Sequence, residues 1–385
     1  MKLAMIGVGQ AGGKLLDRFL AYDEQTSGST ARAALAVNTA RTDLEGLEYI
    51  PRDRRVLIGQ SRVKGHGVGG DNELGATIAQ EDMTQIQREL DELPFHEIDA
   101  FLVIAALGGG TGSGGAPVLA RQLNHLYGEP VYGLGVLPGT DEGSIYTLNA
   151  ARSFRAFVQE ADSLMLFDND AWQKTGESLQ GGYGEINGEI VDRFGVLFGA
   201  GELDGEAVAE SVVDSSEIIN TLRAGGVASV GYATTPVHQK RGLLDRFRRD
   251  GRNGDFDSTN AITSLVRQAT RGRLTLPCDV QGSERALCVV AGPPDRLSRK
   301  GLSRARSWLE DETGSMEVRG GDYPMPGADH LAAVVLFAGV TEAPRLRQLQ
   351  RAAQAAEQDI ETRREQADEE LEEILDAGSD LESLF

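Results

Sequence analysis

The stretch Gly108-Gly109-Gly110-Thr111-Gly112-Ser113-Gly114 directly follows an apolar run over residues 100–107. A short run rich in Val, Ile and Phe is typical of a buried parallel strand, and the apolar spacing after Pro117 predicts a helix with that proline in its first turn. Glycine permits positive φ and lets backbone N–H groups approach a ligand, while a helix N-terminus favours an anion. The stretch is therefore predicted to join a strand to a helix and to bind an anion. A flexible linker is the alternative, but a buried strand and a helix do not usually flank linkers.

Two more glycine-rich stretches follow predicted strands. The run 3–8 leads into residues 7–14, Gly-Val-Gly-Gln-Ala-Gly-Gly-Lys, and the run 55–58 leads to residues 65–72, Gly-His-Gly-Val-Gly-Gly-Asp-Asn. The first contains G-x-G-x-x-G, which binds phosphate at a helix start. It is not a Walker loop, because Val8 and Leu15 stand where that loop needs Gly and Ser or Thr. Three glycine loops at strand ends of one sheet predict a polyphosphate that is enclosed on several sides.

A nicotinamide-dependent oxidoreductase built on residues 7–12 is an alternative. Such enzymes carry an acidic residue at the end of the second strand, where it holds the ribose hydroxyls. Here the strand predicted over residues 33–37 ends in Asn38-Thr39. An amide and a hydroxyl replace the carboxylate, which weakens this alternative.

The composition narrows the class of protein. The 385 residues carry a formal net charge of -21, and only six of the 38 basic residues are lysines. This balance argues against nucleic-acid binding and against adsorption to an anionic membrane, and it suits a cytoplasm at high salt. Two cysteines form neither a disulfide framework nor a zinc site. Since no apolar run reaches about 18 residues, we expect a cytoplasmic protein without direct membrane insertion.

The glycine loops together resemble the tubulin/FtsZ superfamily, whose signature is the GGGTGSG at residues 108–114. The overall pattern is most similar to the archaeal CetZ family, and the resemblance covers roughly residues 1–340. It implies an α/β fold with a Rossmann-like parallel-sheet GTP-binding domain over 1–180 and a long central helix over 181–200. A second, smaller α/β domain for GTPase activation and assembly would cover 201–340, followed by an acidic helical tail over 341–385.

The resemblance also implies a bound guanine nucleotide, GTP or GDP, with Mg2+. Glu142 would hold the ribose, and Asn169 and Asn187 would read the guanine edge. Tyr183 would stack on the base, and it shares a helix face with Asn187 four residues on. Gln10 or Asp71 would lie near the water shell of Mg2+. The residues implied at GTP are Gln10, Ala11, Gly12, Gly13, Lys14, Asn38, Gly69, Gly70, Gly109, Gly110, Thr111, Gly112, Ser113, Glu142, Asn169, Tyr183 and Asn187.

Two residues depart from the family pattern. Lys14 stands where tubulins and FtsZ proteins usually have Asn or Gln, and Tyr146 stands where FtsZ has Arg. Lys14 is expected either to contact the phosphate or base, or to be a solvated lysine of a first helical turn. Tyr146 stands at a position that the family uses to contact the ribose and phosphate, so this contact is expected to differ here.

Residues 209–217 align with the loop that one family member inserts into the nucleotide site of the next subunit. Asp214 and Glu217 are three residues apart, so on a helical turn they project in one direction and could polarise a water toward a γ-phosphate. The alternative is that both acids only cap and solvate a helix start.

The function implied is that of a cytoskeletal GTPase that polymerises head to tail, hydrolyses GTP at the subunit interface and controls cell shape or a related surface process. A GTP-binding switch that does not polymerise is the main alternative. Residues 238–252 hold six basic and two acidic residues and are a candidate for lateral or partner contact, or a solvated loop. The end over 380–385 mixes acids with apolar residues and is either a partner-docking motif or a frayed terminus.

Overall fold

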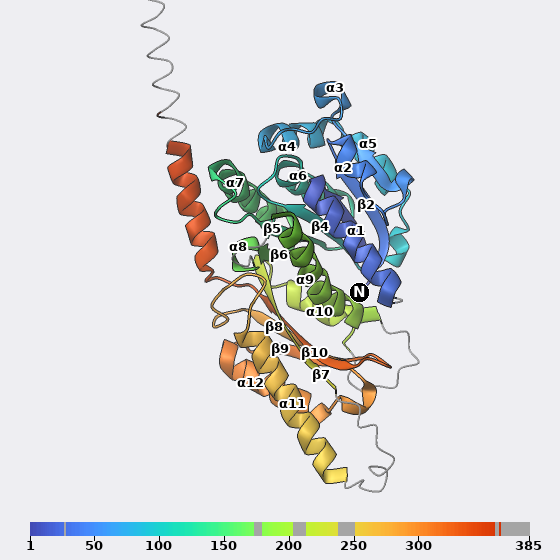
Figure 1. Ribbon diagram of the computed structural model, residues 1–385, viewed down its shortest axis with the longest axis vertical. Coiled ribbons are helices and arrows are strands. Elements are labelled where there is room, and N and C mark those ends of the chain that lie inside the picture. The colour runs from blue at the N-terminus through green and yellow to red at the C-terminus, as the bar shows by residue number, and fades with distance from the viewer. Residues whose placement is uncertain (27, 173–178, 203–212, 238–250, 359–361, 363–385) are drawn as a thin grey trace, which may run out of the picture.

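The computed structural model describes residues 1–26, 28–172, 179–202, 213–237, 251–358 and 362. Their strands form one ten-stranded sheet in the order β3-β2-β1-β4-β5-β6-β7-β10-β8-β9. In Figure 1 the strands and helices of the N-terminal half, blue to green, lie above β8, β9, α11 and α12, and α9 lies between them, while the orange-red helix over 344–358 lies beside the N-terminal half.

The N-terminal half contributes six strands, and each neighbouring pair among them is parallel. Because the strands are parallel, their carboxyl ends meet at one edge, and helices cover the sheet. The strands are β1 (Leu3–Val8), β2 (Ala31–Asn38), β3 (Arg55–Leu57), β4 (Ala100–Ala106), β5 (Val131–Leu137) and β6 (Ser163–Asp168). The helices are α1 (Gly9–Thr26), α2 (Arg41–Glu45), α3 (Gln60–Val63), α4 (Asn72–Glu81), α5 (Met83–Leu90), α6 (Thr111–Leu126), α7 (Ser144–Glu160) and α8 (Asn169–Trp172).

The C-terminal half extends the same sheet. β7 pairs with β6 in parallel through Leu164–Val227 and Met165–Ala228, β10 runs antiparallel to β7 and β8, and β9 is parallel to β8. A further helix covers 344–358. The other elements are α9 (Leu179–Gly199), α10 (Ser215–Leu222), β7 (Val227–Pro236), α11 (Gly251–Arg271), β8 (Arg285–Gly292), α12 (Arg299–Thr313), β9 (Glu317–Pro324) and β10 (His330–Ala338).

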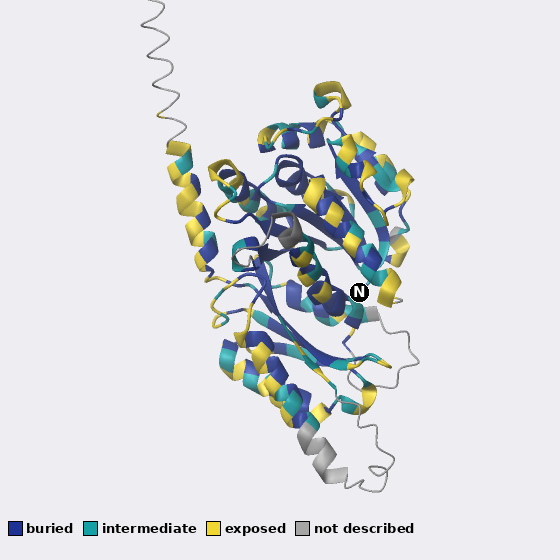
Figure 2. Cartoon of the chain, viewed as in Figure 1, coloured by how far each residue is buried: buried dark blue, intermediate teal, exposed yellow. Residues whose placement is uncertain are grey.

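One apolar cluster runs through both halves. It joins Met5 of β1 and Leu102 of β4 to Phe194 of α9 and to Val334 of β10. Figure 2 shows the strands and the inner side of α9 as buried. Every helix within the described ranges is too short or too polar to span a bilayer.

The predicted strands over 3–8, 100–107, 131–137 and 163–167 are confirmed to within a residue, and a long helix is present where one was predicted over 181–200. The start of α6 was predicted wrongly. This helix begins at Thr111 and not near residue 115, so Pro117 lies inside it and not in its first turn.

The first turns of α6 have two supporting features. Pro117 has no N–H to donate to the carbonyl of Ser113, and the hydroxyl of Ser153 in α7 donates to that oxygen instead, at 2.7 Å. Gly114 lies so close to α4 that a Cβ there would come within 2.1 Å of the Asn72 carbonyl oxygen. Part of the glycine stretch therefore serves close helix packing.

Candidate functional site

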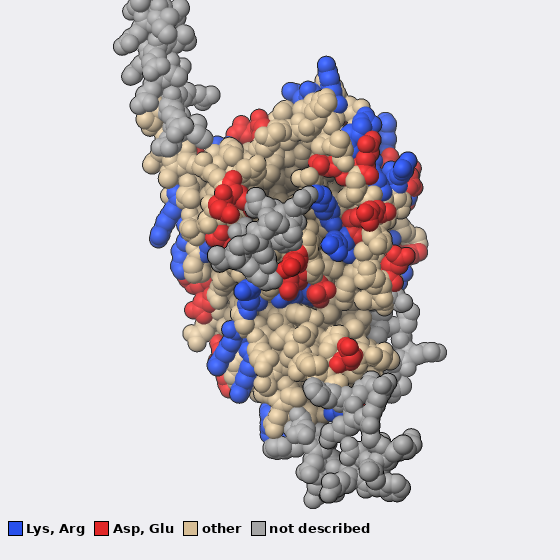
Figure 3. Space-filling view, viewed as in Figure 1, with Lys and Arg blue, Asp and Glu red and all other residues tan. Residues whose placement is uncertain are grey.

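A cavity of about 490 Å³ opens at the carboxyl ends of the parallel strands. Val8 of β1, Asn38 of β2, Ala106 of β4 and Val136 of β5 line it, and so does Asn169, the first residue after β6. This is the edge at which open α/β sheets bind ligands. On the face drawn in Figure 3, acidic and basic side chains are interspersed.

Two helix N-termini form one end of the cavity. α1 begins at Gly9 and α6 at Thr111, and the segments Gly9–Gly12 and Gly108–Gly112 both line the cavity. Backbone N–H groups in the first turn of a helix have no intrahelical acceptor, and the helix dipole adds partial positive charge there. This end can therefore hold a chain of phosphates through the backbone.

Asn149 of α7 ties two glycine loops together. Its side-chain amide nitrogen donates to the carbonyl oxygens of Gly70 at 2.7 Å, Gly108 at 3.0 Å and Gly109 at 3.2 Å, and the residue is only 2% exposed. The loop at 65–71 and the loop at 108–110 are thus fixed to each other by one buried side chain. The sequence analysis did not identify Asn149, and the only available signal was a polar residue within a helical pattern.

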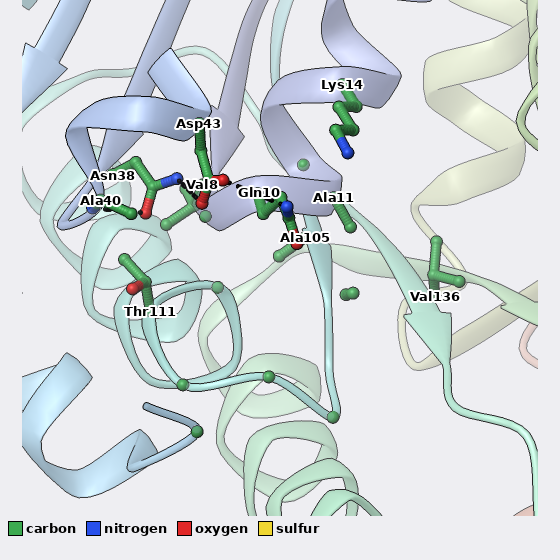
Figure 4. Close-up of a pocket in the computed structure, with 18 of the residues that line it drawn as sticks. Val8, Gln10, Ala11, Lys14, Asn38, Ala40, Asp43, Ala105, Thr111 and Val136 are labelled. Atoms are coloured by element: carbon green, nitrogen blue, oxygen red, sulfur yellow. Dashed lines mark hydrogen bonds between the residues drawn. The ribbon is translucent and has the colours of Figure 1, made fainter. Parts of the chain in front are cut away.

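Asp43 of α2 is a second residue that the sequence analysis missed. Its carboxylate accepts hydrogen bonds from the side-chain amides of Gln10 and Asn38, each at 3.1 Å. Figure 4 shows Asp43 between these two residues at the cavity wall. The helix after β2 therefore places a carboxylate beside Asn38, where it fixes the amides of Gln10 and Asn38.

The end of β6, two strands from β4 in the sheet, contributes a buried acceptor to the cavity wall. Asn169 is 6% exposed, and its side-chain carbonyl oxygen has no hydrogen-bond partner among the described residues. Ile186 and Asn187 of α9 line the same cavity. Tyr183 also lies in α9, but its side chain is outside the described part of the chain. A buried amide oxygen without a donor is expected to find one on a ligand.

Most of the residues predicted at the nucleotide line this one cavity, although they come from segments far apart in the sequence. They are Gln10, Ala11, Gly12, Lys14, Asn38, Gly69, Gly70, Gly109, Gly110, Thr111, Gly112, Glu142, Asn169 and Asn187. Lys14 and Tyr146, the two departures from the family pattern, line it as well. Figure 4 shows Lys14 on α1 beside Ala11, and Lys14 forms no ion pair with any described residue.

Three predicted residues lie outside the cavity lining. A Cβ on Gly13 would contact Leu47 at 3.6 Å, on the core side of α1. The hydroxyl of Ser113 donates to the carbonyl oxygens of Gly109 and Gly110, and therefore braces the glycine loop. Asp71 caps α4 by accepting the Leu74 N–H at 2.9 Å. The hydrogen bonds of Ser113 and Asp71 give these two residues supporting roles in the walls of the cavity, whereas Gly13 faces the core.

Asp214 and Glu217 lie together on α10 and not at the cavity. Asp214 is the N-cap of that helix and accepts the Glu217 N–H at 3.0 Å, as the structural alternative predicted. The Glu217 carboxylate lies 3.7 Å from the Arg319 guanidinium and is about one-third exposed. Within one protomer, these acids and the cavity are not brought together. Of the segment 238–252, predicted as a lateral or partner contact or a solvated loop, residues 238–250 lie outside the described residues, and so does the end over 380–385, predicted as a docking motif or a frayed terminus.

Two family models match the chain. Residues 2–177 match the model described as "Tubulin/FtsZ family, GTPase domain", and residues 176–355 match "Tubulin-like CetZ, C-terminal domain". The first match contains all the cavity residues named above except those of α9.

Relatives and solved structures of the same family are similar to this chain over most of its length. The chain is 64% identical over 370 residues to the tubulin-like protein CetZ1 of Haloferax volcanii, and the alignment covers 94% of each chain. The solved structure of the GDP-bound CetZ1 monomer superposes with a TM-score of 0.84 at 61% identity, covering 93% of this chain and all of that one. A GTPγS-bound protofilament of CetZ2 from the same organism superposes with a TM-score of 0.83 at 46% identity, covering 94% of this chain and all of that one.

Proposed function

Because the chain belongs to the CetZ family of tubulin-like proteins, we propose that its cavity binds GTP and that its protomers stack head to tail and hydrolyse the nucleotide where they meet. One observation carries the proposal. A single cavity is lined both by two helix N-termini, at the ends of β1 and β4, and by the amide residues Asn169 and Asn187.

The phosphates would lie on the helix starts at Gly9 and Thr111. Backbone N–H groups and helix dipoles bind anions without a charged side chain. Asn149 would keep the loop at 65–71 in place over the same phosphates, because it bonds Gly70 and Gly109 at once. A rigid cradle of this kind lowers the entropy cost of binding.

The base would lie against Asn169 and Asn187. Guanine presents N1–H and N2–H donors on its Watson–Crick edge, whereas the equivalent ring nitrogen of adenine is an acceptor. Opposite N1 and N2 of the base, the side-chain oxygen of Asn169 would favour guanine over adenine, whose Watson–Crick donor is at N6. The nicotinamide-dependent alternative loses its basis, since the two family matches together span residues 2–355.

Mg2+ fits this site only as an ion held mainly by the phosphates. The described residues contain no cluster of three or more His, Cys, Asp or Glu side chains that could bind a metal alone. Gln10 and Asp43, which are bonded to each other at 3.1 Å, offer oxygen atoms at the cavity wall. Bound there, Mg2+ would neutralise phosphate charge.

Hydrolysis would need a second subunit. Asp214 and Glu217 are absent from the lining of their own cavity, and Glu217 is partly exposed, so the pair is available to a neighbouring protomer. Repeated head-to-tail contact produces an open filament when the rotation does not close a ring. The GTPγS-bound protofilament of CetZ2 supports this arrangement. Control of cell shape is the cellular role that we propose for such a filament.

Mixing two inactive variants tests the shared site. Glu217→Gln keeps the cavity intact, and Gly109→Leu fills the cavity, since a Cβ at Gly109 meets no protein atom within 4 Å. Each variant alone should hydrolyse GTP slowly, because every interface lacks one half of the site. In an equal mixture, roughly a quarter of the interfaces regain both halves, and turnover should return in proportion. No recovery on mixing would contradict the shared site.

Binding and light scattering decide between the remaining functions. We expect GTP to bind more tightly than ATP and to raise light scattering at high salt, whereas GDP should not. GTP binding without any rise in scattering would favour the switch that does not polymerise. Protection against thermal unfolding by NADH and not by GTP would favour the oxidoreductase.

A further inference from the structure

We infer that Arg345, at the start of the C-terminal helix over 344–358, is a positioning residue for the base and ribose end of the nucleotide cavity. The inference rests on the proposed function, because it assigns a role at the same site. Arg345 does not line the cavity, and it would act through the strand ends that do.

The guanidinium of Arg345 contacts the carboxyl ends of both β5 and β6. Its Nε lies 3.2 Å from Oδ1 of Asp168, the last residue of β6, and its Nη2 donates to the carbonyl oxygen of Pro138, just after β5, at 2.7 Å. The side chains of Arg345 and Asp168 are only 6% and 4% exposed. A planar guanidinium with several donors suits a buried contact of this kind, and a lysine ammonium does not reproduce its geometry.

These contacts lead directly to the predicted base and ribose residues. Asp168 and Asp170 flank Asn169, whose amide oxygen is the unsatisfied acceptor of the cavity. Asp170 lies 3.8 Å from Arg345 and accepts a hydrogen bond from the Thr140 N–H at 2.7 Å. Arg345 therefore places one positive charge between the two acids beside Asn169 and fixes the segment after β5 through Pro138.

The same segment carries Glu142. The Gly139 N–H donates to the Glu142 carboxylate at 2.7 Å, so the loop that Arg345 contacts at Pro138, and reaches at Thr140 only through Asp170, also orients the predicted ribose contact. One residue from the C-terminal helix thus supports both the base contact and the ribose contact.

The C-terminal helix has other anchors, which lets the effect of Arg345 be separated from docking of the helix. Leu349 and Ala353 are buried against the body, and Glu357 lies 3.5 Å from Arg152 of α7. Arg152 also pairs with Glu73 of α4 at 2.9 Å. Removal of the Arg345 charge should therefore leave the helix in place and disturb chiefly the strand ends.

The test compares Arg345→Gln and Arg345→Lys with Arg347→Gln in the full-length protein. Arg347 lies on the same helix and is exposed, and its ion pair is with Glu342, away from the strand ends. We expect Arg345→Gln to weaken GTP binding by about tenfold or more, since the buried Asp168 carboxylate and the partly exposed Asp170 carboxylate lose their shared partner. Arg345→Lys should weaken it less, and Arg347→Gln should leave it unchanged.

A purely structural role would not alter the reading of the base, so the second measurement compares GTP with ITP, which lacks the N2 amino group. The wild type should prefer GTP, and Arg345→Gln should reduce the ratio of the two affinities while Arg347→Gln keeps it. The KM for GTP should rise more than kcat falls.

Folding without nucleotide is checked by thermal unfolding. If Arg345→Gln does not fold, the measurements on Arg345→Lys decide. Wild-type affinity and a wild-type GTP/ITP ratio in the folded Arg345 variants would overturn the inference, whereas a wild type that does not prefer GTP over ATP would overturn the proposed function itself.

Discussion

The hydroxyl of Ser153 donates a hydrogen bond of 2.7 Å to the carbonyl oxygen of Ser113, in a buried contact between α7 and α6. Ser113 is the residue four places before Pro117, so its carbonyl would otherwise lack a donor. A side chain from the next helix thus replaces the missing intrahelical hydrogen bond, close to the glycine loop that lines the cavity.

Replacing Ser153 by Ala should lower the free energy of unfolding by about 1–3 kcal/mol, because a buried carbonyl loses its partner. In a Pro117→Ala background, the new N–H of residue 117 can bond Ser113, so the same Ser153→Ala change should cost clearly less. Denaturant unfolding of the four proteins measures this coupling. Equal costs in both backgrounds would show that Ser153 does not compensate for the proline.

Replacing Asn149 by Ala should weaken GTP binding and lower stability by about 1–3 kcal/mol, since three carbonyl oxygens lose one shared donor. Thr147→Ala is the control, because this half-buried residue of the same helix has a side-chain hydroxyl that bonds only the Gly143 carbonyl oxygen among the described residues. Nucleotide titration and urea unfolding measure the two effects. Unchanged affinity in Asn149→Ala would mean that the two loops hold their positions without it.

Substitutions of Asp214 should separate the cap of α10 from catalysis. Asp214→Ala should cost about 1 kcal/mol of stability, whereas Asp214→Asn should cost little, because Asn is also a good N-cap. If the carboxylate acts on water in the neighbouring site, both variants should lose GTP turnover. Ser298→Ala removes the N-cap of α12 and should cost stability alone. Full turnover in the folded Asp214→Asn variant would leave Asp214 with the capping role only.

Burial raises the pKa of Asp168 from its ordinary 3.8 to about 6, although the nearby Arg345 opposes the shift. The folded state therefore binds more protons than the unfolded state between about pH 4 and 6, so this group lowers stability as the pH rises through that window. Asp168→Asn removes the contribution, and the stability advantage of wild type over this variant should shrink from pH 4 to pH 7. Unfolding at several pH values measures the difference, and a constant difference would refute the shift. Burial also raises the pKa of Asp322 to about 6, so this group changes stability with pH in the same direction. Because Asp322 is present in both proteins, its contribution cancels in the difference.

Local residue patterns predicted the strand ends and the three glycine loops, whereas Glu142, Asn169 and Asn187 were identified only through the resemblance to a known family. A buried strand is a run of apolar residues, and a backbone that must approach a ligand uses glycine, as at residues 108–112. Both patterns can be read without knowledge of the remainder of the fold.

Asn149, Asp43 and Arg345 could not be identified in this way, because their roles depend on residues far away in the chain. Asn149 reaches back to Gly70, and Arg345 to Pro138. In a sequence, a charge at a helix start is normally interpreted as solvated, and only the folded contacts show that Arg345 is buried. The early start of α6 was missed for the same reason, since the donor that accommodates Pro117 comes from α7.

The continuous sheet determines how cooperatively the protein unfolds. The family matches divide the chain near residue 177, but strand pairing crosses from β6 to β7, and one apolar cluster includes β1, β4, α9 and β10. Neither half can leave the other without exposing that cluster to water, so the halves should lose their structure together. Heating should therefore produce one cooperative transition with equal calorimetric and van't Hoff enthalpies, as in a protein half this length.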